Sequence, residues 1–156
     1  MASAPSSESL ARTVSALLAD AAFVFAEPTD ASPSSEESPL VARLTMEHGE
    51  IWELCVCLQD KLGEVLAANL LGTEDDSGEA RAAAADAAGE LANILAGALA
   101  VELFGKDVVC RIGIPVVTIE NGRTVAAQLA SMPCRTNLLT EEGHALAVAL
   151  APKVGA

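Results

Sequence analysis

The sequence predicts an α+β fold, in which a layer of antiparallel strands packs with two long helices and an N-terminal helix. Two observations support this prediction. Three segments have apolar residues at helical spacing, and short strand-like segments come both before and after the two long helices. That order does not suit a doubly wound parallel sheet, where strands and helices alternate. With 156 residues, the chain has room for one domain with a real core.

The helical segments differ in length and in their end signals. The first runs from Leu10 to Phe25, with Ser9 as a plausible N-cap. The second covers Asp60–Leu71. The third is the longest, from Glu79 to Phe104, and Gly105 follows it as a C-cap.

The strand-like segments surround these helices. Asn121-Gly122 is typical of a tight hairpin turn. The last hairpin has alternating large and small residues, which indicates a half-buried strand. We expect strands at Leu40–Met46, Ile51–Leu58, Val108–Ile114, Val116–Ile119, Cys134–Leu139 and His144–Leu150.

Composition predicts how the chain is divided. We expect a disordered tail at residues 1–8, a single domain at 9–151 and a second tail at 152–156. Within the domain, Pro28–Pro39 is rich in proline, serine and acidic residues, which predicts a solvated linker. Gly72–Gly78 predicts an acidic loop.

The formal net charge of -13 excludes several partners. So acidic a surface gains nothing from nucleic-acid counterion release, and it is repelled by anionic membranes. We expect no membrane span, since the longest apolar candidate, Leu91–Val101, is interrupted by Asn93. The N-terminus lacks the basic start of a secretory signal, so a cytoplasmic protein is predicted.

Two cysteines are candidates for a metal site. Cys55 and Cys57 lie two apart in a predicted strand, so their side chains share one face. With His48 or His144 they could supply zinc ligands. The alternative is that they are small buried hydrophobic residues kept reduced. Because no C-x2-C spacing occurs, we favour burial and predict no metal.

The longest helix has one polar arc on an otherwise apolar surface. At 100° per residue its members fall within about 60° of each other. One interpretation is a solvated face. The other is a functional pair, because a carboxamide can hold a water molecule through its donor and acceptor, and a neighbouring carboxylate can pair with a partner's lysine. The arc consists of Glu79, Asp86, Glu90, Asn93 and Gly97.

Glycines favour the functional interpretation. Gly89 and Gly97 each cost about 1 kcal/mol of helix propensity relative to the alanine that this chain uses freely. Their presence suggests close approach by another backbone or by a partner.

The segment Asp86–Gly97 (DAAGELANILAG) resembles the D-x3-E-x2-N-x3-G helix of the CheC/CheX/FliY chemotaxis phosphatases. The order of elements is similar to CheX-like domains, and Ile112–Pro115 is the second specific point of likeness. The family places a proline 23 positions after the Asn, whereas Pro115 comes 22 after Asn93. A one-residue deletion at Gly105–Asp107 would account for the difference.

The resemblance implies a function and roles for residues. Family members dephosphorylate CheY, the aspartyl-phosphorylated response regulator. Glu90 would bond to the regulator's lysine and Asn93 would orient the attacking water, with Asp86, Gly97 and Pro115 as supporting motif positions. The Mg²⁺ belongs to the regulator, so no cofactor is expected. The resemblance also implies a homodimer, and the C-terminal hairpin offers an edge for pairing.

A second, degenerate motif is found in the preceding helix. Asp60 and Glu64 repeat the acidic spacing, but Ala67 stands where the Asn would be. This is either a site without its water-positioning amide or a chance match between two amphipathic helices. Both interpretations predict one active site per chain.

An alternative function is a non-catalytic binding or dimerisation module with the same fold, in a chemotaxis or two-component pathway. An unrelated small-molecule enzyme has little support. The sequence has no nucleophile elbow, P-loop, Rossmann glycine pattern or histidine triad.

Overall fold

The computed structural model describes residues 2–30, 38–73 and 78–153, and it confirms the α+β class. Seven strands and four helices are found within these ranges. In chain order they are α1 Ser7–Ala22, β1 Ala26–Pro28, β2 Leu40–His48, β3 Glu50–Leu58, α2 Asp60–Leu71, α3 Gly78–Phe104, β4 Arg111–Ile112, β5 Val116–Ile119, α4 Gly122–Ser131, β6 Cys134–Thr140 and β7 Ala145–Pro152.

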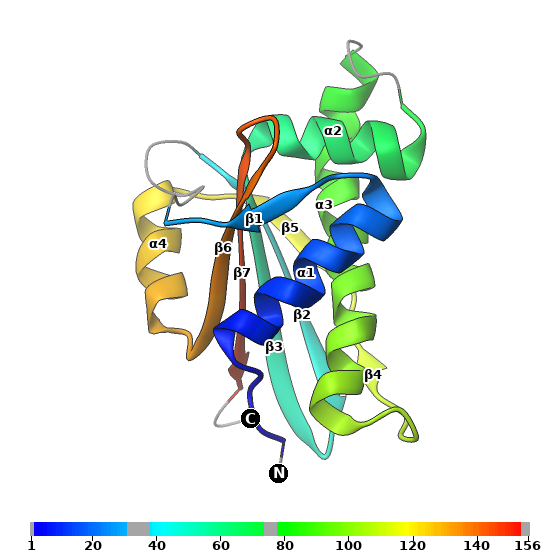
Figure 1. Cartoon of the computed structure of the whole chain (residues 1–156), viewed down its shortest axis with the longest axis vertical. Coiled ribbons are helices and arrows are strands. Elements are labelled where there is room, and N and C mark those ends of the chain that lie inside the picture. Colours follow the sequence, from blue (N-terminus) through cyan, green and yellow to red (C-terminus); the bar gives the residue numbers. More distant parts are fainter. Residues whose placement is uncertain (1, 31–37, 74–77, 154–156) are drawn as a thin grey trace.

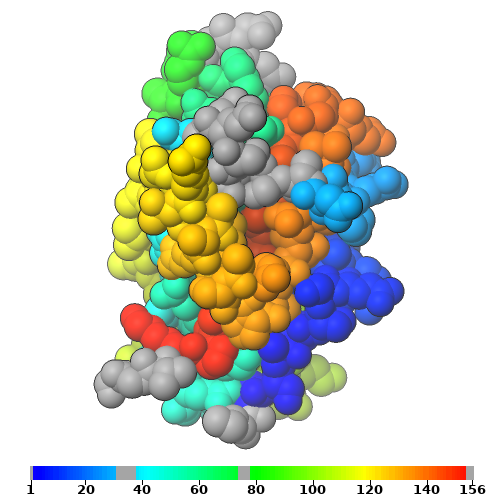
Figure 2. Space-filling view, turned by 90° about the vertical axis from the view of Figure 1, so that its left-hand side faces the viewer, coloured from blue at the N-terminus to red at the C-terminus, as the bar shows by residue number. Residues whose placement is uncertain are grey.

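The strands form one antiparallel sheet with the order β1-β6-β7-β3-β2-β4, and β5 also pairs with β2. Helices α1 and α3 lie over one face, with α2 above them, whereas α4 covers part of the other (Figure 1). Figure 2 shows the molecule from the α4 side. Alternate strand residues divide between the two faces. In β3, Leu54 and Val56 pack toward α1 and α3, while Cys55 and Cys57 pack toward α4.

The first helix begins earlier and ends earlier than predicted. Ser6, not Ser9, is the N-cap, and its Oγ accepts a hydrogen bond from the Ser9 amide at 3.0 Å. The helix ends at Ala22, where Phe23 adopts a left-handed conformation (φ 55°). The prediction of a disordered tail at residues 1–8 is therefore wrong at its end, and the Ala2 amide donates to Glu50 Oε1 at 2.7 Å.

The predicted hairpin turn at Asn121-Gly122 is wrong, because Asn121 is the N-cap of the helix α4. Its Oδ1 accepts hydrogen bonds from the amides of Arg123 and Thr124, at 2.9 and 3.3 Å. Val125 and Leu129, one turn apart, are buried against the sheet. Asparagine is favoured both in tight turns and at N-caps, and here the apolar spacing after it decides for the helix.

Most other elements agree with the prediction. One exception is Val108–Ile114, of which only Arg111–Ile112 pairs as a strand, and another is β1, which was not predicted. In the predicted linker, Pro28 belongs to β1, and residues 31–37 lie outside the described residues. Residues 74–77 of the acidic loop and the terminal residues 154–156 also lie outside them.

The C-terminal hairpin does not provide the open edge that we expected. Strand β7 lies inside the sheet, between β6 and β3. On the other side of β6, β1 pairs with Leu138–Thr140. This part of the sheet is therefore already hydrogen-bonded within the chain.

Helix α3 is long and apolar enough to cross a membrane by length and composition, contrary to the sequence expectation. It packs, however, against β2, β3 and β5 and against α1 and α2. Leu91, Leu95 and Leu99 are fully buried or nearly so. The apolar character of α3 is thus explained by its place in the core.

Candidate functional site

The polar arc of α3 faces away from the core. Asp86, Glu90, Asn93 and Gly97 are all exposed, while the residues between them include the buried core stripe. Glu90 and Asn93 are three residues apart, so their side chains are neighbours on the helix surface. Within the described residues, neither side chain has a hydrogen bond or ion pair. A carboxylate and a carboxamide are therefore presented together and free to bind a partner.

The two glycines of the motif have different surroundings. A Cβ on Gly89 would lie 3.6 Å from Pro115 Cγ and 3.5 Å from Val117 Cγ2, at ordinary van der Waals distance. A Cβ on Gly97 would meet no atom within 4 Å. Gly89 thus lies where α3 contacts Pro115 and β5, whereas the surface at Gly97, one turn beyond Asn93, is open.

The segment Ile112–Pro115 lies beside the motif helix, as the contact between Pro115 and Gly89 shows. The Gly113 amide donates to the Thr45 carbonyl oxygen at 2.8 Å. A Cβ on Gly113 would lie only 2.9 Å from Thr45 Oγ1, so a side chain here would force a shift. The one-residue shorter spacing to Pro115 is compatible with close packing between Pro115 and the motif helix.

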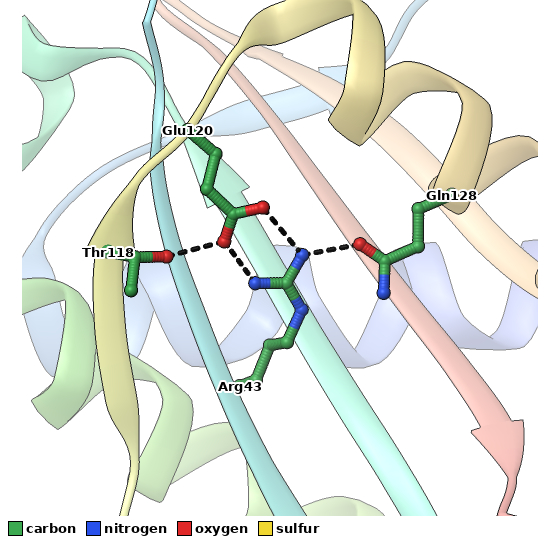
Figure 3. Close-up of polar contacts among 4 residues, drawn as sticks. All are labelled: Arg43, Thr118, Glu120 and Gln128. Atoms are coloured by element: carbon green, nitrogen blue, oxygen red, sulfur yellow. Dashed lines mark hydrogen bonds and ion pairs between the residues drawn. The ribbon is translucent and has the colours of Figure 1, made fainter.

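A polar network on the other face of the sheet holds β5 in place (Figure 3). The guanidinium group of Arg43 on β2 donates to both carboxylate oxygens of Glu120, which follows β5, and to Gln128 Oε1 on α4. The Thr118 hydroxyl donates to Glu120 as well. The hydrogen bond with Glu120 raises the pKa of Arg43, and the same contact lowers the pKa of Glu120.

Sequence reasoning missed this network because Asn121-Gly122, directly after Glu120, was assigned to a hairpin turn. The network joins β2, β5 and α4, so it fixes the strand whose Val117 side chain packs on Gly89. An arginine in a strand that otherwise has buried apolar residues was the available signal, since such a group needs a charged partner.

The second motif on α2 is placed differently from the motif on α3. Ala67 is fully buried in the core. Glu64 has a side chain only 15% exposed, in ion pairs of 3.2 Å with Lys61 and with Arg81 of α3. Burial raises the pKa of Glu64, but the hydrogen bonds from Lys61 and Arg81 outweigh it and the pKa is lowered. Asp60 is exposed at the start of the helix. The position equivalent to Asn93 therefore faces the core rather than solvent.

The cysteine pair lies between the sheet and α4, away from both histidines. Burial raises the pKa of Cys55 to about 11 and that of Cys57 to about 12, so both are protonated thiols at neutral pH. His48 contacts the Val109 carbonyl oxygen through Nδ1 at 3.0 Å, and His144 lies beside the β6–β7 turn. Among the described residues, no three His, Cys, Asp or Glu side chains gather as a possible metal site.

Comparison with known proteins decides the family. Residues 46–137, more than half of the chain, match the family model described as chemotaxis phosphatase CheX. The chain belongs to the CheX family. This match includes the whole of α3 and the segment Ile112–Pro115. Among curated proteins, no sequence matches this CheX-family chain significantly.

Solved structures of the CheC/CheX/FliY group share the fold. A CheX from Desulfovibrio desulfuricans has a TM-score of 0.67 at 14% identity, with 94% of this chain and 98% of that chain covered. The CheX-CheY-BeF3-Mg²⁺ complex from Borrelia burgdorferi gives 0.66 at 17% identity, covering 94% and 96%. FliY from Thermotoga maritima gives 0.56 at 16% identity, covering 96% and 92%. At these identities the likeness shows the common fold.

Proposed function

We propose that this CheX-family chain accelerates hydrolysis of the aspartyl phosphate on a CheY-type receiver domain, with Glu90 and Asn93 as its catalytic residues. The observation that carries the proposal is the pair itself. Both side chains are exposed, adjacent and unpaired within the described residues, on a helix whose opposite side is fixed in the core. The homologous complex of CheX with CheY supports the choice of partner.

In the proposed reaction, Asn93 enters the phosphorylation pocket and its carboxamide binds the attacking water. The water oxygen forms a bond to phosphorus while the bond from phosphorus to the aspartyl oxygen breaks. The electron pair of the broken bond stays on the regenerated aspartate, and the water proton leaves with the phosphate. Asn93 is unchanged, because it positions the water and removes no proton.

Glu90 has a separate role in this proposal. Its carboxylate pairs with the lysine of the receiver's phosphate site and so fixes the helix in register. Asp86, Gly97 and Pro115 support the motif without touching the phosphate. The chain needs no cofactor or metal of its own, since the Mg²⁺ of the reaction is bound by the receiver.

We also propose, from the family resemblance, that the protein acts in the cytoplasm as a homodimer in a two-component pathway. Because β1 already pairs with Leu138–Thr140 of β6, that part of the C-terminal hairpin edge is not open to a second copy. Sedimentation velocity of the purified chain distinguishes a dimer from a monomer.

The decay of a phosphorylated CheY-type receiver tests the proposal. Asn93→Ala should lower kcat by about 10²–10³ while the affinity for the receiver is retained, because one positioned group is lost from the transition state. Glu79→Ala removes an exposed carboxylate from the same arc and is the matched control. A wild-type chain that leaves the decay rate unchanged would contradict the proposal. If that chain still bound the receiver tightly, the non-catalytic binding module would be favoured instead.

A further inference from the structure

The segment 111–119, which contains β4 and β5, pairs with β2 and lies beside the motif helix. It contains one residue too many for regular pairing with β2. Arg43 of β2 is paired with Val116, and Met46, three residues later, is paired with Ile112. Two residues of β2 therefore face three residues, 113–115, of the segment between β4 and β5. This is the arrangement of a β-bulge, which bends a strand and changes the direction of a side chain.

The residue at the centre of this bulge is Ile114, whose exposed fraction is 89%. The residues before and after it are both fixed by contacts with the rest of the protein. The Gly113 amide is hydrogen-bonded to the Thr45 carbonyl oxygen, and Pro115 packs on Gly89. The fixed neighbours leave Ile114 little freedom to fold back onto the surface, so a large apolar side chain is presented to solvent.

Ile114 is joined to a residue that contacts the motif helix. It directly precedes Pro115, whose Cγ is 3.6 Å from the Cβ position of Gly89. Gly89 is followed by Glu90 and lies one helical turn before Asn93. A protein that reaches Asn93 therefore also meets the bulge.

The character of the polar arc explains why an apolar contact is needed here. The motif side chains on α3 are two carboxylates and one amide, and the chain as a whole carries -13. Such a surface provides few attractive charges for a receiver whose phosphorylated site is itself anionic. Apolar burial does not depend on charge, and a few well-buried side chains dominate the affinity of interfaces.

We infer that Ile114 is an affinity-determining residue of the receiver-binding site, and that it packs against apolar side chains beside the receiver's phosphorylation pocket. The inference rests on the proposed function, since it takes the same receiver as the occupant. It assigns affinity for the receiver to Ile114 in the bulge and catalysis to the residues of the helix. Substitutions at the two places should therefore change different quantities, KM and Kd at the bulge and kcat on the helix.

The test measures kcat and KM for the phosphorylated receiver, and the Kd for the same receiver loaded with BeF3⁻ and Mg²⁺. Ile114→Ser should raise KM and Kd about tenfold or more and leave kcat unchanged. Ile114→Val should restore most of the affinity. Asn93→Ala should show the reverse, with kcat lowered and Kd retained. Phe23→Ser is the matched control, because Phe23 is 73% exposed but lies near β1, at the opposite edge of the sheet.

The outcomes separate the two proposals. If wild type is active and Ile114→Ser has wild-type KM and Kd, the inference is overturned while the proposed function stands. If wild type binds in an Ile114-dependent manner but does not accelerate phosphate loss, the contact stands and the proposed function fails. A wild-type chain that does not bind the loaded receiver would overturn both. Circular dichroism and thermal unfolding confirm that each variant is folded.

Discussion

Helices α2 and α3 have similar acidic spacings but present different surfaces. On α3, the carboxylate Glu90 and the amide Asn93 face solvent. On α2, the carboxylate Glu64 is held by Lys61 and Arg81, and Ala67 is buried. A short sequence match is thus not sufficient for a site, because the rotation of the helix relative to the core decides which residues a partner can reach.

The largest stability effect is expected from placing the missing amide on α2. Ala67→Asn should lower the free energy of unfolding by about 2–4 kcal/mol, because a polar, larger side chain enters a filled core without partners. It should create no second site, so the phosphatase rate per folded chain stays unchanged. Ala82→Asn at an exposed position of α3 is the control, with a loss of about 0.7 kcal/mol. Urea denaturation measures both, and a rate that doubled in Ala67→Asn would contradict the comparison.

Replacing one glycine by alanine on each helix should change the free energy of unfolding in opposite directions. On α2, a Cβ at Gly63 would lie 2.9 Å from Leu40 Cδ1 and 3.0 Å from Ala84 Cβ. Gly63→Ala should therefore lower the free energy of unfolding by about 1–2 kcal/mol. Gly97→Ala on α3 enters open space and should raise it by about 0.5–1 kcal/mol. Thermal unfolding of the two variants side by side checks the signs, and equal signs would show that packing does not distinguish the helices.

The last prediction concerns the strand that supports α3, with an effect on stability about as large as that of Gly63→Ala. Glu120→Gln should lower the free energy of unfolding by about 1–2 kcal/mol, because Arg43 loses its charged partner. The pKa of Glu120 is lowered in the folded protein, so its stabilisation is present above its ordinary pKa of 4.5 and is lost as the pH falls below that value. Wild type and variant should thus differ near pH 7 and converge in acid. A difference that does not change with pH would contradict this assignment.

The sequence predicted most of the fold and the position of the polar arc. The α3 arc could be predicted because a helix of 27 residues has a regular period, so the faces follow from spacing alone. Helix α4 was missed because Asn121-Gly122 suits both a tight turn and an N-cap. The signal that distinguishes them is the one-turn spacing of Val125 and Leu129, which is short and weak.

The contacts around the site could not be predicted in the same way. Arg43 and Glu120 are 77 positions apart, and only the pairing of β2 with β5 brings them together. The bulge at Ile114 likewise appears only when the register of Arg43 and Met46 is compared with that of Val116 and Ile112. Strand register is a property of two segments, and one segment alone does not determine it.

The sequence by itself therefore determined the fold class, the length of the motif helix and which of its residues share a face, since these follow from local periodicity. The tertiary structure decided which face the core covers. It buried Ala67, left Glu90 and Asn93 exposed, and packed Pro115, the residue after Ile114, against Gly89 of the motif helix. The physical reason is that burial depends on packing between elements far apart in the chain, and the hydrophobic effect acts on the whole surface rather than on a motif.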